Sequence, residues 1–232
     1  MPAIVSGEYS DSNIFYMSYL STYLERDIKE LSQTIDSLKF MKFITAVAAR
    51  CSQLVNYSSI AEDAEINEVT AKNWCGVLET LGIIFYLHPY SNNILKRTIK
   101  TPKIYFYDTG LVTYLTKWSS PETLESGAMN GAVIENYVVS EVYKSYYNEA
   151  KTPFIYYYRD KEPNEIDLII ETDGQLLPIE IKKTASPSPE LVKVFKVLDK
   201  PSIKRGRGAV VCMKEELSAF NEQNIIIPIR LI

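Results

Sequence analysis

The chain has 232 residues, a formal net charge of −4 and 46% hydrophobic residues. This length and apolar content predict a folded protein with one large domain or two small ones, and we favour two. The acidic balance excludes a generally basic coat for nucleic acids, so any contact with DNA must be local.

The cysteines and the single histidine argue against a zinc site. Cys51, Cys75 and Cys212 are far apart and lie in apolar surroundings, and His88 is the one histidine. This pattern predicts buried, reduced thiols. No apolar run approaches the ~20 residues of a membrane helix, and no signal peptide opens the chain. We therefore expect a soluble, cytoplasmic protein without a membrane partner; the oligomeric state stays open.

The first part of the chain predicts helices followed by a hairpin. Residues 1–36 carry a helical rhythm of aromatic and charged side chains, which predicts a connector helix. Residues 37–118 then predict a winged-helix domain, built from helices at 37–55, 59–65 and 68–81 and strands at 83–88 and 104–107.

Three residues mark the expected ends of these helices. Ser59 begins a capping-box pattern for the second helix, and Asn67 can cap the third. Gly82 follows the third helix as its C-terminal stop, and Val69 is among the side chains expected to face inward.

A second unit is predicted over residues 127–232. Helical periodicity is lost and Ser, Pro and Gly accumulate between residues 117 and 127, which indicates a domain boundary. The elements expected beyond it are helices at 127–147 and 190–198 and strands at 154–159, 209–213 and 225–231, with a β-hairpin over residues 164–182. The whole chain is thus predicted to be α/β (α+β), with a mixed sheet in the second unit.

The hairpin has a well-defined predicted register. Asp173-Gly174 suits both central positions of a type I′ turn and lies between two alternating apolar runs. One face then becomes apolar through the pairs Ile166–Ile181, Leu168–Ile179 and Ile170–Leu177.

The other face of the hairpin is charged. The same register places Asp167 opposite Glu180 and Glu165 opposite Lys182. Opposed acids need a compensating cation, which a divalent metal or Lys182 can supply. The alternative is a solvated face on which Glu165 pairs with Lys182.

Glu135 is a further acid of interest on the expected helix at 127–147. It shares a helix face with Val138, Val139 and Val142, where a carboxylate is costly without a purpose. The alternative is that Glu135 favours the positive end of the helix dipole and turns its carboxylate outward.

A helix acid, an acid on one strand and E-x-K on the next resembles the PD-(D/E)XK nuclease core. The resemblance covers residues 127–232 and implies Asp167 and Glu180 as ligands of Mg²⁺ or Mn²⁺. It further implies Glu135 as an accessory acid and Lys182 as the catalytic lysine. Ile166 stands where the family often has proline.

A wider resemblance covers nearly the whole chain. The motifs YLERDI at 23–28, KIYFYDTGL at 103–111 and GAVIEN at 131–136 are similar to the C-terminal module of archaeal-type AAA+ ATPases, a domain of unknown function. This implies an ATPase module upstream, although G-x-x-x-x-G-K-[ST] is absent from this chain. We expect either a fragment of a longer protein or a naturally short relative.

Two basic clusters are candidates for contacts with DNA phosphates. They are Lys96, Arg97, Lys100 and Lys103 near the expected wing, and Lys204, Arg205 and Arg207 in the second unit. The expected recognition helix itself carries no net positive charge.

We predict a nuclease-like DNA-processing module with Mg²⁺-dependent phosphodiester hydrolysis, positioned by an ATPase. The alternatives are a catalytically silent module that docks a partner or regulates the ATPase, and a DNA-binding regulator that does not cut.

Overall fold

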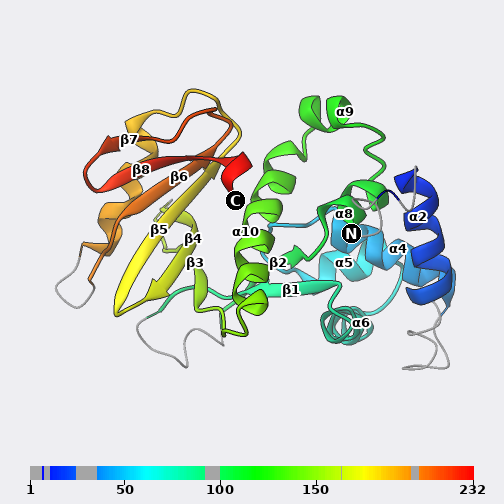
Figure 1. Ribbon diagram of the computed structural model, residues 1–232. Coiled ribbons are helices and arrows are strands. Elements are labelled where there is room, and N and C mark those ends of the chain that lie inside the picture. The colour runs from blue at the N-terminus through cyan, green and yellow to red at the C-terminus, as the bar shows by residue number, and fades with distance from the viewer. Residues whose placement is uncertain (1–6, 8–10, 25–35, 92–99, 163, 200–203) are drawn as a thin grey trace.

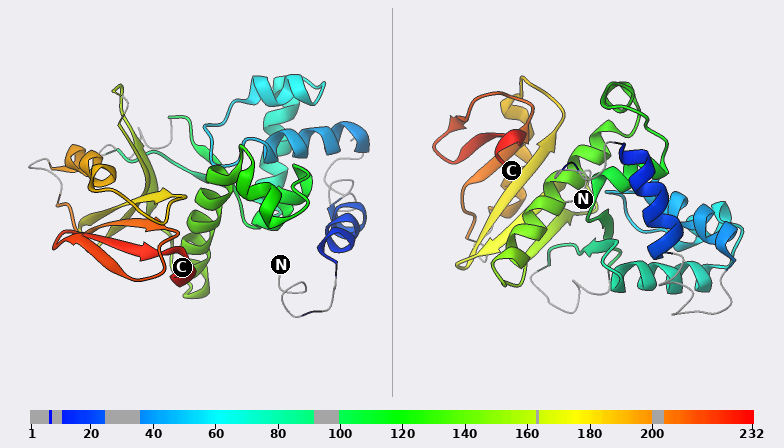
Figure 2. Two further views of the ribbon diagram at one scale, coloured as in Figure 1. Left: turned by 90° about the horizontal axis from the view of Figure 1, so that it is seen from above. Right: turned by 45° about the vertical axis from the view of Figure 1, so that its right-hand side comes forward.

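The computed structural model describes residues 7, 11–24, 36–91, 100–162, 164–199 and 204–232. Helices and a small two-stranded sheet lie on one side, a six-stranded sheet on the other, and the long helix α10 (Asn130–Asn148) runs between them (Figures 1 and 2). The predicted mixed α and β class is confirmed. We call residues 11–118 the helical unit and residues 130–232 the sheet unit, in each case for their described parts. Among the described residues, no helix is long and apolar enough to span a membrane.

The first helix among the described residues is α2 (Ser12–Ser18), which continues into the π-helical turn η1 (Tyr19–Leu24). Tyr16 and Leu20 are buried, and the Tyr16 hydroxyl donates to Asp108 Oδ1 at 2.6 Å. Residues 12–24 are therefore helical as predicted for the connector. Residues 25–35 lie outside the described part of the chain.

Three further helices follow: α4 (Ser37–Ala48), α5 (Tyr57–Asp63) and α6 (Glu68–Thr80). The prediction for Asn67 is confirmed, because its side chain accepts from the Thr70 amide at 2.8 Å. The prediction for Ser59 is wrong. Asn56 caps α5 instead, and its side chain accepts from the Ser59 amide at 3.1 Å. Val69 was expected inward but is 70% exposed.

The helix predicted over 37–55 ends at Ala48 because the next residues pair with a strand. The strands β1 (Ile84–Leu87) and β2 (Lys103–Phe106) form an antiparallel pair. The Ser52 amide donates to the Ile104 carbonyl at 2.7 Å, and the Ile104 amide donates to the Gln53 carbonyl at 3.0 Å. The chain after α4 is thus fixed by β2 rather than by a further helical turn.

Two short helices lead to α10. Asp108 caps α8 (Thr109–Leu115) by accepting from the Leu111 amide at 2.7 Å. Helix α9 (Pro121–Ser126) was not predicted, since the sequence there shows a boundary pattern. Ser120 caps it through a reciprocal bond with Thr123.

The large sheet has the strand order β3-β4-β5-β6-β8-β7. Its strands are β3 (Ile155–Arg159), β4 (Glu165–Thr172), β5 (Gln175–Lys182), β6 (Gly208–Cys212), β7 (Ser218–Asn221) and β8 (Asn224–Pro228). Strands β5, β6 and β8 are parallel, and the remaining pairs are antiparallel. The 3₁₀ helices η2 (Pro189–Leu198) and η3 (Ile229–Leu231) complete the unit. Strand β7 was not predicted.

One of the hydrophobic clusters spans both units. Phe85 and Tyr105 of the small sheet pack in the same cluster as Val138 and Val139 of α10. Asn136, fully buried in α10, accepts from the Phe106 amide at 2.7 Å and donates to the Phe106 carbonyl at 3.0 Å. Helix α10 is therefore fixed to β2 by hydrogen bonds between the Asn136 side chain and the β2 main chain as well as by packing.

Candidate active site

Asp167, Glu180 and Lys182 come together on the neighbouring strands β4 and β5. Lys182 Nζ lies 2.9 Å from Asp167 Oδ2 and 2.9 Å from Glu180 Oε2. The two acid side chains are 10% and 6% exposed, whereas the Lys182 side chain is 40% exposed. The lysine thus bridges two buried carboxylates and also reaches the surface.

The type I′ turn and most of the predicted hairpin register are confirmed. Asp173 and Gly174 have φ of +48° and +69°. Strand β4 pairs with β5 through Leu168–Ile179 and Ile170–Leu177 as expected. The continuous pairing ends at Leu168–Ile179, just before the acids.

The predicted Ile166–Ile181 pair is wrong because β4 carries a bulge. Its pairing with β3 changes between Tyr156–Ile169 and Tyr158–Ile166. Ile166 therefore packs with Phe195 of η2, while Ile181 belongs to the cluster that includes Val138 and Val139 of α10. Such bulges are common beside active sites, where they re-aim a side chain.

At this bulge Asp167 takes the place of a main-chain acceptor. Its Oδ2 accepts from the Ile181 amide at 2.8 Å as well as from Lys182. The Asp167 side chain therefore points at β5 next to Glu180, although the regular pairing of β4 with β5 has ended before this residue. The bulge brings the two acids close together through their side chains.

The surroundings strongly perturb Glu180. Burial, together with the negative charge of Asp167, raises the pKa of Glu180 to about 8, against the opposing effect of Lys182. Burial alone would lower the pKa of Lys182, but Asp167 and Glu180 raise it further than burial lowers it. Glu180 Oε1 is buried and has no hydrogen-bond partner. One lysine thus leaves this acid pair incompletely satisfied.

A second group of charges lies beside the first. Lys103 Nζ of β2 is 2.9 Å from Glu135 Oε1 and 2.7 Å from Glu165 Oε1. The Tyr105 hydroxyl also donates to Glu135 Oε1, at 2.7 Å. The alternative in which Glu165 pairs with Lys182 is therefore wrong. So is the alternative in which Glu135 turns outward, because this carboxylate is 16% exposed and bonded inside the protein.

Lys103 is not placed to contact DNA phosphates. Its side chain is 5% exposed, and both of its partners are carboxylates. Burial opposes the charged form of Lys103, yet Glu135 and Glu165 raise its pKa overall. Burial likewise raises the pKa of Glu135, against the effect of Lys103. This correction follows from the pairing of β2 in the interior, which the basic sequence pattern did not reveal.

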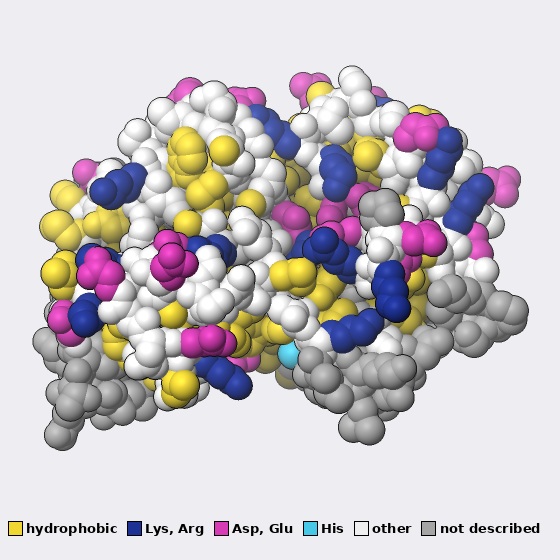
Figure 3. All heavy atoms as spheres, turned by 180° about the vertical axis from the view of Figure 1, so that it is seen from behind, with side chains coloured by type: hydrophobic (Ala, Val, Ile, Leu, Met, Phe, Trp, Pro, Cys, Tyr) yellow, Lys and Arg dark blue, Asp and Glu magenta, His cyan; other side chains and the backbone are white. Residues whose placement is uncertain are grey.

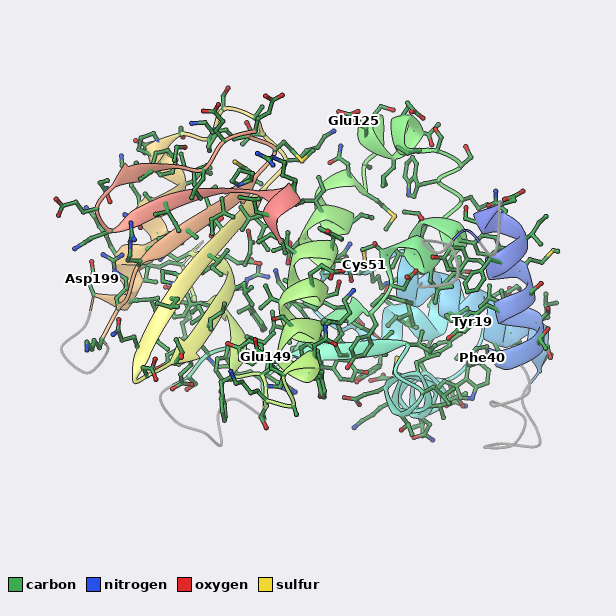
Figure 4. All side chains as sticks on the ribbon, viewed as in Figure 1. Tyr19, Phe40, Cys51, Glu125, Glu149 and Asp199 are labelled. Carbon is green, nitrogen blue, oxygen red and sulfur yellow. The ribbon has the colours of Figure 1, made fainter. Side chains whose placement is uncertain are left out.

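The other predicted basic residues lie away from the acids or outside the described part. Lys96 and Arg97 are not among the described residues, and Lys100 is exposed. Residues 204–207 lie beside Leu176, at the end of β5 opposite Lys182, which is roughly 20 Å away along the strand. This cluster is made up of Lys204, Arg205 and Arg207. Arg205 pairs there with Asp199, labelled at the outer end of the sheet in Figure 4.

Tyr105 was missed by the sequence analysis, and Lys103 was assigned the wrong role. The sequence feature that could have revealed them is the spacing of two residues between this lysine and this tyrosine in a short apolar strand, because it places both side chains on one face. Figure 3 shows acidic and basic side chains mixed in the hollow between the two lobes. Within the described ranges, no three His, Cys, Asp or Glu side chains are grouped closely enough to hold a metal ion.

Comparisons with known proteins identify two domains of unknown function. The model of the domain of unknown function DUF8612 matches residues 1–122, and that of DUF4143 matches residues 130–232. The uncharacterized proteins Rv2008c of Mycobacterium tuberculosis and Mb2031c of Mycobacterium bovis are each 30% identical over 187 residues. These matches cover 81% of this chain and 42% of each relative, so the chain spans less than half of their length.

A solved structure, protein VC1899 from Vibrio cholerae, aligns with 14% identity over 89% of this chain and 48% of that one. Its TM-score is 0.25, which is too low to support a fold assignment. The match to residues 1–122 spans more than half of the chain, and the protein therefore belongs to the DUF8612 family, with a region matching DUF4143 after it.

Proposed function

We propose that this chain is a nuclease-like module that hydrolyses phosphodiesters with the help of Mg²⁺ or Mn²⁺. The observation that carries the proposal is the acid pair on β4 and β5, in which Lys182 bridges Asp167 and Glu180 while Glu180 Oε1 stays buried without a partner. An ordinary ion pair on the surface of a sheet forms without burying its carboxylate, whereas both of these carboxylates are buried. Two inward carboxylates of this kind are typical of a cation site.

The donor set fits a hard divalent cation. Carboxylate oxygens are the ligands that Mg²⁺ prefers, and Asp167 and Glu180 would hold it. When bound, the ion would supply charge neutralisation and water activation. Burial and the charge of Asp167 raise the pKa of Glu180. A bound ion would act in the opposite direction and favour the ionised form of Glu180. Lys182, which reaches the surface, would hold the attacking water or a phosphate oxygen by donating a hydrogen bond.

The arrangement of elements supports the wider assignment. We infer that α4, α5, α6 and the β1–β2 hairpin form a winged helix, and that α10 with the large sheet forms a PD-(D/E)XK-like domain. DUF4143 is typically a C-terminal module of AAA-ATPase-associated proteins, and the curated relatives are more than twice as long as the aligned segment. We therefore propose that an ATPase module precedes this region in the same polypeptide.

DNA is the proposed substrate, and its contacts would be local because the chain is acidic overall. Arg159 is 53% exposed and lies 3.9 Å from Glu165, so it is a basic side chain beside the acids. Lys204 and Arg207 are exposed at the far end of β5. They would contact the phosphates of a duplex at a distance from the cleavage position.

The experiment is a cleavage assay with Mg²⁺ or Mn²⁺ on single-stranded, linear and supercoiled DNA. We expect cleavage that is lost in Asp167→Ala and retained in Glu222→Gln, a matched change of an exposed acid in the β7–β8 turn. The nuclease proposal would be abandoned if Asp167→Ala left the cleavage of every form unchanged.

A second candidate function is a silent module that docks a partner or regulates the ATPase. It is favoured by the ion pairs themselves, because Lys182 and Lys103 already bridge the acids without any metal. Calorimetric titration with Mn²⁺ separates the two candidates. Binding that disappears in Asp167→Ala supports the nuclease, and absence of binding in the wild-type chain supports docking.

A further inference from the structure

Lys103 is a buried cation that the helical unit contributes to the sheet unit. Its ammonium lies between Glu135 of α10 and Glu165 of β4, at hydrogen-bonding distance from each, and the Tyr157 ring centroid is 5.7 Å away. A lysine is rarely so buried unless its charge is fully paired. Here it is paired with two acids from the other unit.

Hydrogen bonds to β3 fix the segments that flank β1 and β2, and with them the backbone around this lysine. The Tyr157 amide of β3 donates to the His88 carbonyl at 3.1 Å, and the Tyr90 amide donates to the Tyr157 carbonyl at 2.6 Å. The Tyr157 hydroxyl donates to the Thr101 carbonyl at 2.6 Å. The segments flanking β1 and β2 are therefore bonded to the edge strand of the large sheet, which keeps the backbone of Lys103 close to the two acids.

The two acid pairs form one electrostatic group. Glu165 and Asp167 lie two residues apart on β4, so the two pairs are neighbours. Beside burial and their direct partners, the charge of Asp167 adds to the rise in the pKa of both Lys103 and Glu135. With Glu165 and Glu180, the group has four carboxylates and, in Lys103 and Lys182, two ammonium groups. Fully ionised, these six groups carry an excess of negative charge even with Arg159 3.9 Å from Glu165, and a divalent cation would offset it.

We propose that the Lys103 ammonium takes the position that a second divalent cation would need, so that the acid group binds a single metal ion. The helical unit would thereby supply part of the site and set its affinity for metal. This inference rests on the proposed function, because it concerns the ion held by Asp167 and Glu180. Lys103 is a positioning residue in this arrangement, since it acts on the site through Glu135 and Glu165.

The test is calorimetric titration of the full chain with Mn²⁺. The wild type should bind one ion. Lys103→Met removes a positive charge near that ion and should bind it about tenfold more tightly or take up a second ion. Glu165→Gln removes a negative charge and should bind it about tenfold more weakly. The matched surface pair Lys144 and Glu141 provides the controls Lys144→Met and Glu141→Gln, which should leave the affinity unchanged.

Tighter binding in Lys103→Met together with weaker binding in Glu165→Gln identifies an electrostatic role. A lysine with a purely structural role would not make the two variants change the affinity in opposite directions. Binding of two ions by the wild type, or equal affinity in wild type and both variants, would overturn this inference and leave the proposed metal site intact. Absence of binding in the wild type would overturn both. If Lys103→Met fails to fold, Glu165→Gln decides alone, because this side chain is 35% exposed: weaker binding supports the inference and unchanged affinity overturns it.

Discussion

Replacing Glu180 with glutamine should make the stability of the protein less sensitive to alkaline pH. Burial and Asp167 raise the pKa of Glu180 from 4.5 to about 8. The unfolded chain therefore releases this proton at lower pH than the folded protein. The stability that neutral Glu180 contributes is present below about pH 4.5 and is lost as the pH rises through about 8.

The size of the effect follows from the pKa difference. A difference between 4.5 and about 8 corresponds to roughly 4–5 kcal/mol between the folded and unfolded states. Between about pH 5 and about pH 9, the wild type should therefore lose about 4 kcal/mol of unfolding free energy that Glu180→Gln keeps. Lys182 keeps Asp167 as a partner in this variant, so the lysine is not left unpaired.

The assay is urea unfolding without metal ions, followed by the fluorescence of Trp74 and Trp118. Glu222→Gln, an exposed glutamate, provides the matched control and should follow the wild type at every pH. The reasoning is refuted if Glu180→Gln and wild type lose stability in parallel from about pH 5 to about pH 9.

Three further predictions concern the framework of the site, each measured as a change in unfolding free energy. Asn136→Leu should destabilise the protein by roughly 2–5 kcal/mol, because both main-chain groups of Phe106 lose a buried partner; a smaller loss than that of a surface control would contradict this. Asn67→Ala should cost about 1 kcal/mol through the lost cap on the Thr70 amide, and Asn67→Asp should restore it. Gly174→Ala should cost about 1 kcal/mol because φ is +69°, whereas Gly174→Asn should be milder; equal stability of all three chains would be inconsistent with this turn.

Local patterns gave correct predictions where one short segment decides the outcome. The turn at Asp173-Gly174 and the register beyond it follow from residues that are neighbours in sequence. The same is true of the cap at Asn67. These interactions span only a few residues, so alternation and turn chemistry are sufficient to specify them.

Predictions failed where distant segments compete for the same main chain. The helix predicted over 37–55 ends early because the amides of Ser52 and Val55 bond to carbonyls near β2. Ile166 changes faces because β4 must fit β3 as well as β5, and a bulge absorbs the difference. Neither partner strand can be inferred from the segment itself.

The sequence by itself determined the acids and the lysine of the hairpin, because a period of two and a turn dipeptide place them on adjacent strands. Only the tertiary structure decided how their charges are paired. Lys103 is basic and close in sequence to other basic residues, yet it lies inside because β2 packs against α10 and β4. The physical reason is that a buried charge is paired by whichever opposite charge the fold brings near, and here that partner comes from the other unit.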